Sequence, residues 1–185
     1  QALAFQRGLK IHLDGARVAN AAVAQGIAIA DIAVHFDSVS ICLSKGLCAP
    51  VGSLLLGDER LIKKATRWRK MLGGGMRQAG ILAAAGELAL TAQVERLADD
   101  HQNAAYLAQQ LSLLDEFEID LPSVQTNMVF ATLASHIDEQ SLAQRCRNEG
   151  ILISPGRTIR FVTHKDVSRQ DIDKVLRVFK LHLQA

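Results

Sequence analysis

A lysine and an aspartate near the start of the chain each accompany a run of residues typical of a buried strand. Lys45 lies in a turn of small residues directly after the run 37–43, and Asp14 ends the run 9–14. A lysine amine forms an imine with an aldehyde, and a carboxylate facing a pyridine nitrogen keeps that nitrogen protonated. Pyridoxal 5'-phosphate (PLP) requires both groups. The pair therefore predicts a PLP site in which Lys45 forms the imine and Asp14 faces the ring nitrogen.

Arg17 strengthens this interpretation, because an arginine three residues after the aspartate can reach the phenolic oxygen of the cofactor. Taken alone, Asp14 and Gly15 form a common turn pair, and Lys45 could extend into solvent where its strand ends. His12 lies on the same face as Asp14 in a regular strand, so it either supports that carboxylate by a hydrogen bond or is a core histidine. The predicted site thus depends on Lys45, Asp14 and Arg17 together.

Apolar runs alternate with a helix-forming segment through the first part of the chain. Strands are expected at 9–14, 37–43 and 51–56, and an alanine-rich helix at 18–24. Strand, helix and strand in this order favour a mainly parallel sheet covered by helices, which is the α/β class. Ligands of such sheets bind at the carboxyl ends of strands, where Asp14, Arg17 and Lys45 all fall.

A long helix is predicted to lead from this part into a second domain. Asp58 can cap a helix at 59–71, and glycines at 73–75 end it. An alanine- and leucine-rich helix then runs from about 78 to about 114, with a bend near Gly86. We therefore divide the chain into residues 1–114, the C-terminal part of a large PLP-binding domain, and residues 115–185, a small C-terminal α/β domain.

The second part is expected to contain a small antiparallel sheet and two helices. Strands are predicted at 127–133, 150–154 and 158–163, and helices at 138–148 and 168–183. The net charge of +2 gives no reason to expect nucleic acid or a membrane surface as a partner. The three cysteines lack the spacing of metal ligands, so we expect no metal and a reduced, cytoplasmic protein.

Five segments of the chain resemble, in order and spacing, the low-specificity L-threonine aldolases of the PLP-dependent beta-eliminating lyase and threonine aldolase family. They are His12–Arg17, Ile41–Leu47, Arg67–Met71, Gly73–Gln78 and Arg160–His164. The resemblance extends from about residue 8 to the C-terminus. It implies the fold of the PLP-dependent transferases, in which a large domain with a mainly parallel sheet is followed by a small α/β domain.

The resemblance also implies a reaction, namely cleavage of L-threonine or L-allo-threonine into glycine and acetaldehyde by a cytoplasmic homodimer or homotetramer. Arg160 matches the arginine that binds the substrate α-carboxylate, and a guanidinium suits that task because it can bind a carboxylate through two hydrogen bonds. Lys70 and Arg77 fall in a region that approaches a neighbouring subunit's site in relatives. Arg77 is therefore expected to bind the cofactor, and Lys70 the small amino-acid substrate.

Members of the resembled family are longer, and the chain resembles only their C-terminal portion. The remainder is expected to carry a phosphate-binding loop, a histidine stacked on the cofactor ring and further substrate contacts. We therefore expect residues 1–185 alone to bind PLP poorly and to be inactive, and we assign no general base. Two alternatives stay open: another PLP-dependent beta-eliminating lyase, and a non-catalytic remnant that acts only in subunit association.

Overall fold

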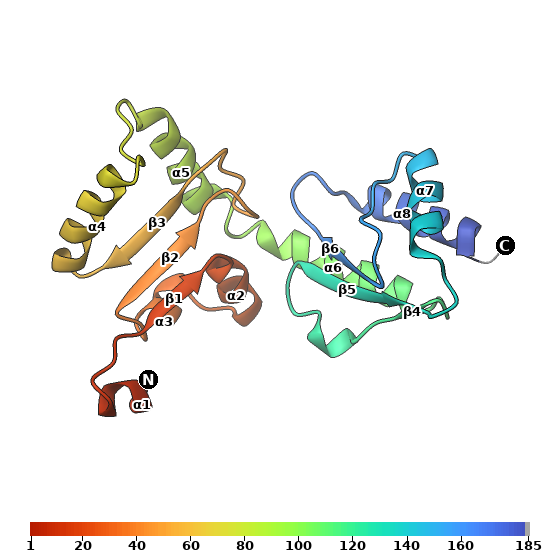
Figure 1. The fold of residues 1–185 in the computed structure, drawn as a ribbon, viewed down its shortest axis with the longest axis horizontal. Coiled ribbons are helices and arrows are strands. Elements are labelled where there is room, and N and C mark those ends of the chain that lie inside the picture. The colour runs from red at the N-terminus through yellow and green to blue at the C-terminus, as the bar shows by residue number, and fades with distance from the viewer. Residues whose placement is uncertain (184–185) are drawn as a thin grey trace. The chain divides into compact units, whose positions relative to one another are not determined.

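The computed structural model describes residues 1–183. Backbone contacts divide the chain into two compact units, Gln1–Leu97 and Ala98–Ala185 (Figure 1). The helices of the first unit are α1 (Ala2–Gln6), α2 (Val18–Gln25), α3 (Ile29–Ala33), α4 (Glu59–Met71) and α5 (Gly80–Ala92). Its strands are β1 (His12–Gly15), β2 (Ser38–Cys42) and β3 (Ser53–Gly57).

The sheet of the first unit has the order β1-β2-β3. β1 and β2 are parallel, and Asp14 lies opposite Ser40. β2 and β3 are antiparallel, and residues 43–52, which include Lys45, connect them. The predicted α/β class is confirmed, and the parallel pairing holds for the two strands that precede Arg17 and Lys45.

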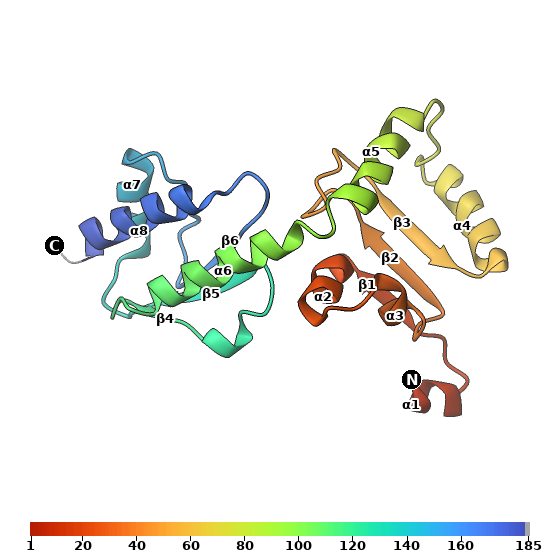
Figure 2. The ribbon, with the colours of Figure 1, turned by 180° about the vertical axis from the view of Figure 1, so that it is seen from behind.

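The core of the first unit lies on one face of β1 and β2. Val39 and Ile41 of β2 are buried there, whereas the serines that alternate with them are only partly buried. Val18 and Ala19 of α2 pack against these residues. Every residue of β3 is exposed, and α4 contacts β3, as both ribbon views show (Figures 1 and 2). Alternation in β2 thus leaves its polar side chains on the face opposite the core.

The second unit is a small antiparallel sheet covered by helices on one face. Its sheet has the order β4-β5-β6, formed by β4 (Phe117–Glu118), β5 (Met128–Leu133) and β6 (Thr158–Val162). Its helices are α6 (Leu97–Leu111), whose first residue ends the first unit, the 3-10 turn η1 (Leu121–Ser123), α7 (Glu139–Asn148) and α8 (Arg169–Leu183).

Burial in β5 explains this one-sided arrangement. Val129, Ala131 and Leu133 are buried against α6, α7 and α8, whereas Phe130 on the other face is 51% exposed. Phe179 of α8 is completely buried in the same core. The antiparallel sheet expected for this part is confirmed, including the helices predicted at 138–148 and 168–183.

The long helix predicted from 78 to 114 is two helices, α5 and α6, separated by residues 93–96. The predicted bend at Gly86 was wrong, because Gly86 lies buried within α5 and the break comes later. A Cβ atom on Gly86 would lie 3.1 Å from Leu43 Cδ1, so the glycine permits a close approach between α5 and the segment that leads to Lys45. Its role is close packing, not bending.

The compact units divide at 97/98, before the boundary expected at 114/115. The physical reason is the packing of α6, which buries Ala104, Leu107 and Leu111 in the core of the second unit. The pattern of small and apolar residues in 78–114 is continuous in sequence, so it did not reveal that two cores share it. The assignment of the two parts as a large PLP-binding domain and a small domain stays a prediction.

The strand predicted at 150–154 was also wrong, because residues 151–155 have no regular structure. Gly150 has a φ of +77°, which starts the segment outside strand geometry, and Pro155 cannot donate a ladder hydrogen bond. The helix starts were predicted better. Asp58 accepts a hydrogen bond from Leu61 N at 2.7 Å at the start of α4, and the predicted helix at 59–71 is confirmed.

Replacing the cap of α7 should reduce stability measurably. Asp138 accepts a hydrogen bond from Ser141 N at 2.6 Å, so Asp138→Ala is expected to lower the free energy of unfolding by about 1 kcal/mol. Asp138→Asn should retain most of that stability, because its amide oxygen can accept the same bond. Urea denaturation followed by circular dichroism measures both.

Asp120→Ala is the matched control for this change, since Asp120 precedes η1 without a side-chain cap hydrogen bond. It should change the free energy of unfolding by less than about 0.5 kcal/mol. Equal losses for Asp138→Ala and Asp120→Ala would mean that the Asp138 cap contributes nothing specific.

Candidate functional site

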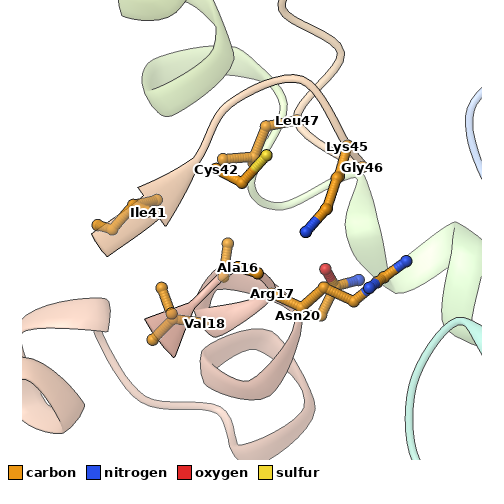
Figure 3. Close-up of a pocket in the computed structure, with 11 residues that line it drawn as sticks. Ala16, Arg17, Val18, Asn20, Ile41, Cys42, Lys45, Gly46 and Leu47 are labelled. Carbon is orange, nitrogen blue, oxygen red and sulfur yellow. The ribbon is translucent and has the colours of Figure 1, made fainter. Parts of the chain in front are cut away.

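Lys45 and Arg17 line one pocket at the edge where β1 and β2 end. The pocket walls also include Asn20, Cys42 and the small residues Gly15, Ala16 and Gly46. In Figure 3 the Lys45 side chain extends from its loop toward Arg17 and Asn20. Because β1 and β2 are parallel, their carboxyl ends meet at the same edge, and the segments that follow them approach each other. The structure therefore brings these two predicted residues together.

Backbone hydrogen bonds close the loop that carries Lys45. Cys48 N donates to Lys45 O at 2.9 Å, and Ala49 N donates to Leu43 O at the same distance. Lys45 itself is exposed, and among residues 1–183 its ammonium has no hydrogen-bond or ion-pair partner. The amine is thus held on an ordered turn and is available to a ligand.

Asp14 lies in β1, one residue before the segment that lines the pocket. Its carboxylate oxygen Oδ1 accepts a hydrogen bond from Ala16 N at 3.1 Å, which fixes one side of the carboxylate. The side chain is exposed on the polar face of the sheet, opposite Ser40 in the register. The structure places Asp14 at the same edge as Lys45 but does not include it in the pocket wall.

His12 does not take either of the two roles considered for it. Its Nδ1 lies 2.8 Å from Ser38 Oγ on the neighbouring strand, and its side chain is exposed. It is therefore neither a buried core histidine nor a residue bonded to Asp14. The pattern of alternation predicted its face correctly, but it could not identify Ser38 as the partner, because that requires the register of β1 against β2.

Cys42 also lines the pocket, although the sequence predicted no role for it there. Its Sγ lies 3.5 Å from Ser44 Oγ, and this hydrogen bond is the main cause that lowers the pKa of the Cys42 thiol. Partial burial acts in the opposite direction, while the charges of Lys45 and Arg17 add smaller downward effects. The signal in the sequence was the alternation Ser38, Ser40, Cys42, which places the thiol on the polar face.

Lys70 and Arg77 lie in the first unit but do not line the pocket of Lys45. Lys70 is in the last turn of α4, and Arg77 follows the glycine-rich stretch; both are exposed. A Cβ atom on Gly75 would lie 2.7 Å from Lys70 Cδ, so this glycine lets the chain fold back over the lysine stem. Their expected contacts with cofactor or substrate stay predictions.

Arg160 belongs to the second unit, where it lies in β6 opposite Phe130. It is exposed on the open face of the sheet and lines a hollow with Pro155 and Phe161. The neighbouring Arg157 has a structural task instead, since its Nη1 donates to Ala134 O at 2.6 Å and its Nη2 lies 3.1 Å from Glu139 Oε1.

A sequence profile of the beta-eliminating lyases matches residues 1–134. The chain belongs to this family. Over 170 residues it is 48% identical to the low specificity L-threonine aldolase of Escherichia coli strain K12. This alignment covers 92% of this chain and 50% of the relative. Over 182 residues it is 38% identical to the low-specificity L-threonine aldolase 1 of Arabidopsis thaliana, covering 96% of this chain and 51% of the relative. The resemblance carried by the five segments is thereby confirmed.

Several solved structures match the chain along nearly its whole length. The threonine aldolase of Leishmania major covers all of it with a TM-score of 0.76 at 24% identity, and the match spans 54% of that protein. An alanine–glyoxylate aminotransferase from Nostoc covers 98% with a TM-score of 0.67 at 18% identity, and 56% of that protein is matched. These matches support the fold alone, and the chain spans about half the length of the curated relatives it matches.

Two other classes of site find no support in the part of the chain that the structure describes. Residues 1–183 contain no group of three or more histidine, cysteine or acidic side chains placed to hold a metal ion. None of the helices within this range is long and apolar enough to cross a membrane.

The Cys42 thiol should react with alkylating agents at lower pH than an ordinary cysteine. Because its pKa is lowered, Cys42 has a larger thiolate fraction than an ordinary cysteine at the same pH, and the thiolate is the nucleophile. Ser44→Ala removes the main cause of the shift, so the midpoint of its rate–pH curve should move upward. Iodoacetamide labelling, with mass spectrometry of the Cys42 peptide, measures this midpoint.

Ser40→Ala is the control, because Ser40 lies on the same face of β2 without a hydrogen bond to Cys42 among the contacts of the described residues. Its midpoint should equal that of the unaltered protein. Identical midpoints for Ser44→Ala and Ser40→Ala would contradict the assigned cause.

Proposed function

We propose that the protein containing this chain is a PLP-dependent aldolase that cleaves L-threonine or L-allo-threonine into glycine and acetaldehyde. The support for the reaction is the name of the matched relatives, low-specificity L-threonine aldolases, at identities of 38% and 48%. The support for the chemistry is the pocket that brings Lys45 and Arg17 to the carboxyl edge of the strands next to Asp14. This pocket is the single observation on which the proposal depends.

The residues of the pocket fit PLP as a ligand. Lys45 has a primary amine without a partner among residues 1–183, and the small residues Gly46 and Ala16 line the same pocket. When bound, PLP supplies an aldehyde that reacts with amines and a protonated ring that accepts the electron pair left when a bond to Cα breaks. A site for it needs an amine, a carboxylate and a cation, which are Lys45, Asp14 and Arg17.

Each of these residues takes one task in the proposal. Lys45 Nζ would hold the cofactor through its aldehyde group. The Asp14 carboxylate would face the ring nitrogen and favour its protonated form, and its hydrogen bond from Ala16 N limits the rotation of the carboxylate. Arg17 would donate to the phenolic oxygen. Its backbone is fixed because it precedes the first turn of α2.

The substrate and the phosphate need further cations. Arg160 binds the α-carboxylate of the substrate through two parallel N–H···O hydrogen bonds. This contact orients the Cα–Cβ bond that is to be broken. Arg77 and Lys70 contact the cofactor and the substrate of a neighbouring copy of the protein, which is a cytoplasmic homodimer or homotetramer. Both side chains are exposed on the first unit, as a role at an interface between copies requires.

The function is tested by removing the Lys45 amine. Lys45→Ala should abolish acetaldehyde production from threonine, because no other amine lines the pocket among the described residues. Borohydride reduction of the loaded protein should attach the cofactor to the peptide that contains Lys45, and the variant should show no attachment there. Lys63→Ala is the control, since Lys63 pairs with Glu59 on exposed α4.

The reaction products distinguish an aldolase from a beta-eliminating lyase. Pyruvate and ammonia from serine, cysteine or tryptophan, without acetaldehyde from threonine, would identify a beta-eliminating lyase instead. Unchanged attachment and turnover in Lys45→Ala would remove Lys45 from the site.

Arg160→Lys should raise the KM for threonine by about 10- to 100-fold. A lysine keeps the charge but cannot form the two parallel hydrogen bonds, and charge-assisted bonds of this kind contribute about 1.5–3 kcal/mol. The absorbance of the bound cofactor should stay unchanged, because Arg160 contacts the substrate. Steady-state kinetics measures KM, and Arg147→Lys in the last turn of α7 is the control. An unchanged KM would exclude Arg160 as the carboxylate ligand.

A further inference from the structure

Arg96 contacts the turn that carries Lys45, although fifty positions separate Arg96 from Gly46 of that turn. Its Nη2 donates to Gly46 O at 2.8 Å. Gly46 O is the carbonyl of the residue directly after Lys45, and it accepts a second bond from Cys48 Sγ at 3.2 Å. Two donors therefore hold the peptide group between Gly46 and Leu47, in the turn that carries Lys45. Both lie in the first unit, with Lys45 itself.

The guanidinium of Arg96 is fixed from its other side. Its Nε donates to Gln93 Oε1 at 3.1 Å, and its Nη2 lies 3.8 Å from Cys48 Sγ. Arg96 is half-buried, and the next residue, Leu97, is completely buried in the core of the first unit. The segment 93–96, which interrupts the helix predicted from the sequence, is thus anchored and presents the guanidinium to Gly46.

The turn after Lys45 needs this support because its backbone is strained. Cys48 has a φ of +62°, in the left-handed region that residues other than glycine rarely adopt. Such conformations persist only where the surroundings determine them, and they gather at functional sites. The hydrogen bonds from Arg96 and from the Cys48 thiol to the Gly46 carbonyl hold the turn in this conformation.

We propose that Arg96 is a positioning residue that fixes the direction of Lys45 through the Gly46 carbonyl. The inference rests on the proposed function of Lys45. Lys45 has a flexible four-carbon stem, and among residues 1–183 its ammonium has no partner that could hold it. The backbone of the turn therefore sets where the Lys45 side chain starts and in which direction it leaves, and Arg96 holds that backbone although it does not line the pocket.

The test compares Arg96→Gln and Arg96→Lys with Arg145→Ala in the protein that contains this chain. Arg145 is a matched control, because its Nη1 also donates to a backbone carbonyl, His182 O at 3.1 Å, but in the second unit. The cofactor-free readout is hydrogen exchange of the Cys48 and Ala49 amides, which bond to Lys45 O and Leu43 O. Both amides should exchange faster in Arg96→Gln and unchanged in Arg145→Ala.

The second readout is the rate at which cofactor-free protein attaches PLP, followed by absorbance and by borohydride trapping at Lys45. Arg96→Gln should slow attachment by about 10- to 100-fold, as expected when a reacting group is misplaced by a distant change. kcat should fall by a similar factor while KM for threonine changes little. The attachment rate of Arg96→Lys should lie between those of Arg96→Gln and the unaltered protein, because lysine keeps the charge and can still donate a hydrogen bond.

Cys48→Gly keeps the experiment decisive if Arg96→Gln does not fold. It removes the thiol donor, but glycine adopts positive φ without strain, so attachment should be slowed less than in Arg96→Lys. If the unaltered protein attaches no PLP at Lys45, the proposed function fails. If it does and a folded Arg96→Gln matches it in exchange and attachment, Arg96 has no positioning role. Faster exchange of these amides in Arg96→Gln with normal PLP attachment would make Arg96 merely structural and would also overturn the proposal.

Discussion

Parallel pairing of β1 with β2 is the constraint on which the candidate site depends. Two parallel strands end at the same edge, so the segments that follow them meet although the chain between them forms two helices. Arg17 follows the first strand and Lys45 the second, and both line one pocket there. The pairing in turn depends on Val39 and Ile41, whose burial fixes which face of β2 is apolar and hence the face that carries Cys42. A shift of the register by one residue would reverse these faces.

The residues in and beside this pocket were predictable because their signals are local. Lys45 is recognised from the strand and turn around it. Asp14 and Arg17 are recognised from their spacing of three residues, and neither signal requires a distant contact. The caps at Asp58 and Asp138 are equally local, and both helices begin where the sequence indicates. Resemblance in five segments added the family, which the profile match over residues 1–134 confirms.

What the sequence did not reveal depends on contacts between distant residues. The break at 93–96 leaves no strong local mark, because it arises where Arg96 bonds to Gly46 and Leu97 enters a core. His12 could not be paired with Ser38 before the register was known. Arg160 presents the same limit at a larger scale, since it lies in the second compact unit and its expected role depends on more than its own strand.

Gly86 couples two positions that no hydrogen bond connects. A glycine in the middle of a helix costs stability relative to alanine, so its presence in α5 reflects the space taken by Leu43. Leu43 begins the turn that carries Lys45, since its carbonyl accepts from Ala49 N. A Cβ atom at position 86 would leave the turn undisturbed only if the end of the Leu43 side chain gave way by a few tenths of an ångström. The composition of α5 thus records how closely this helix packs on the segment that leads to Lys45.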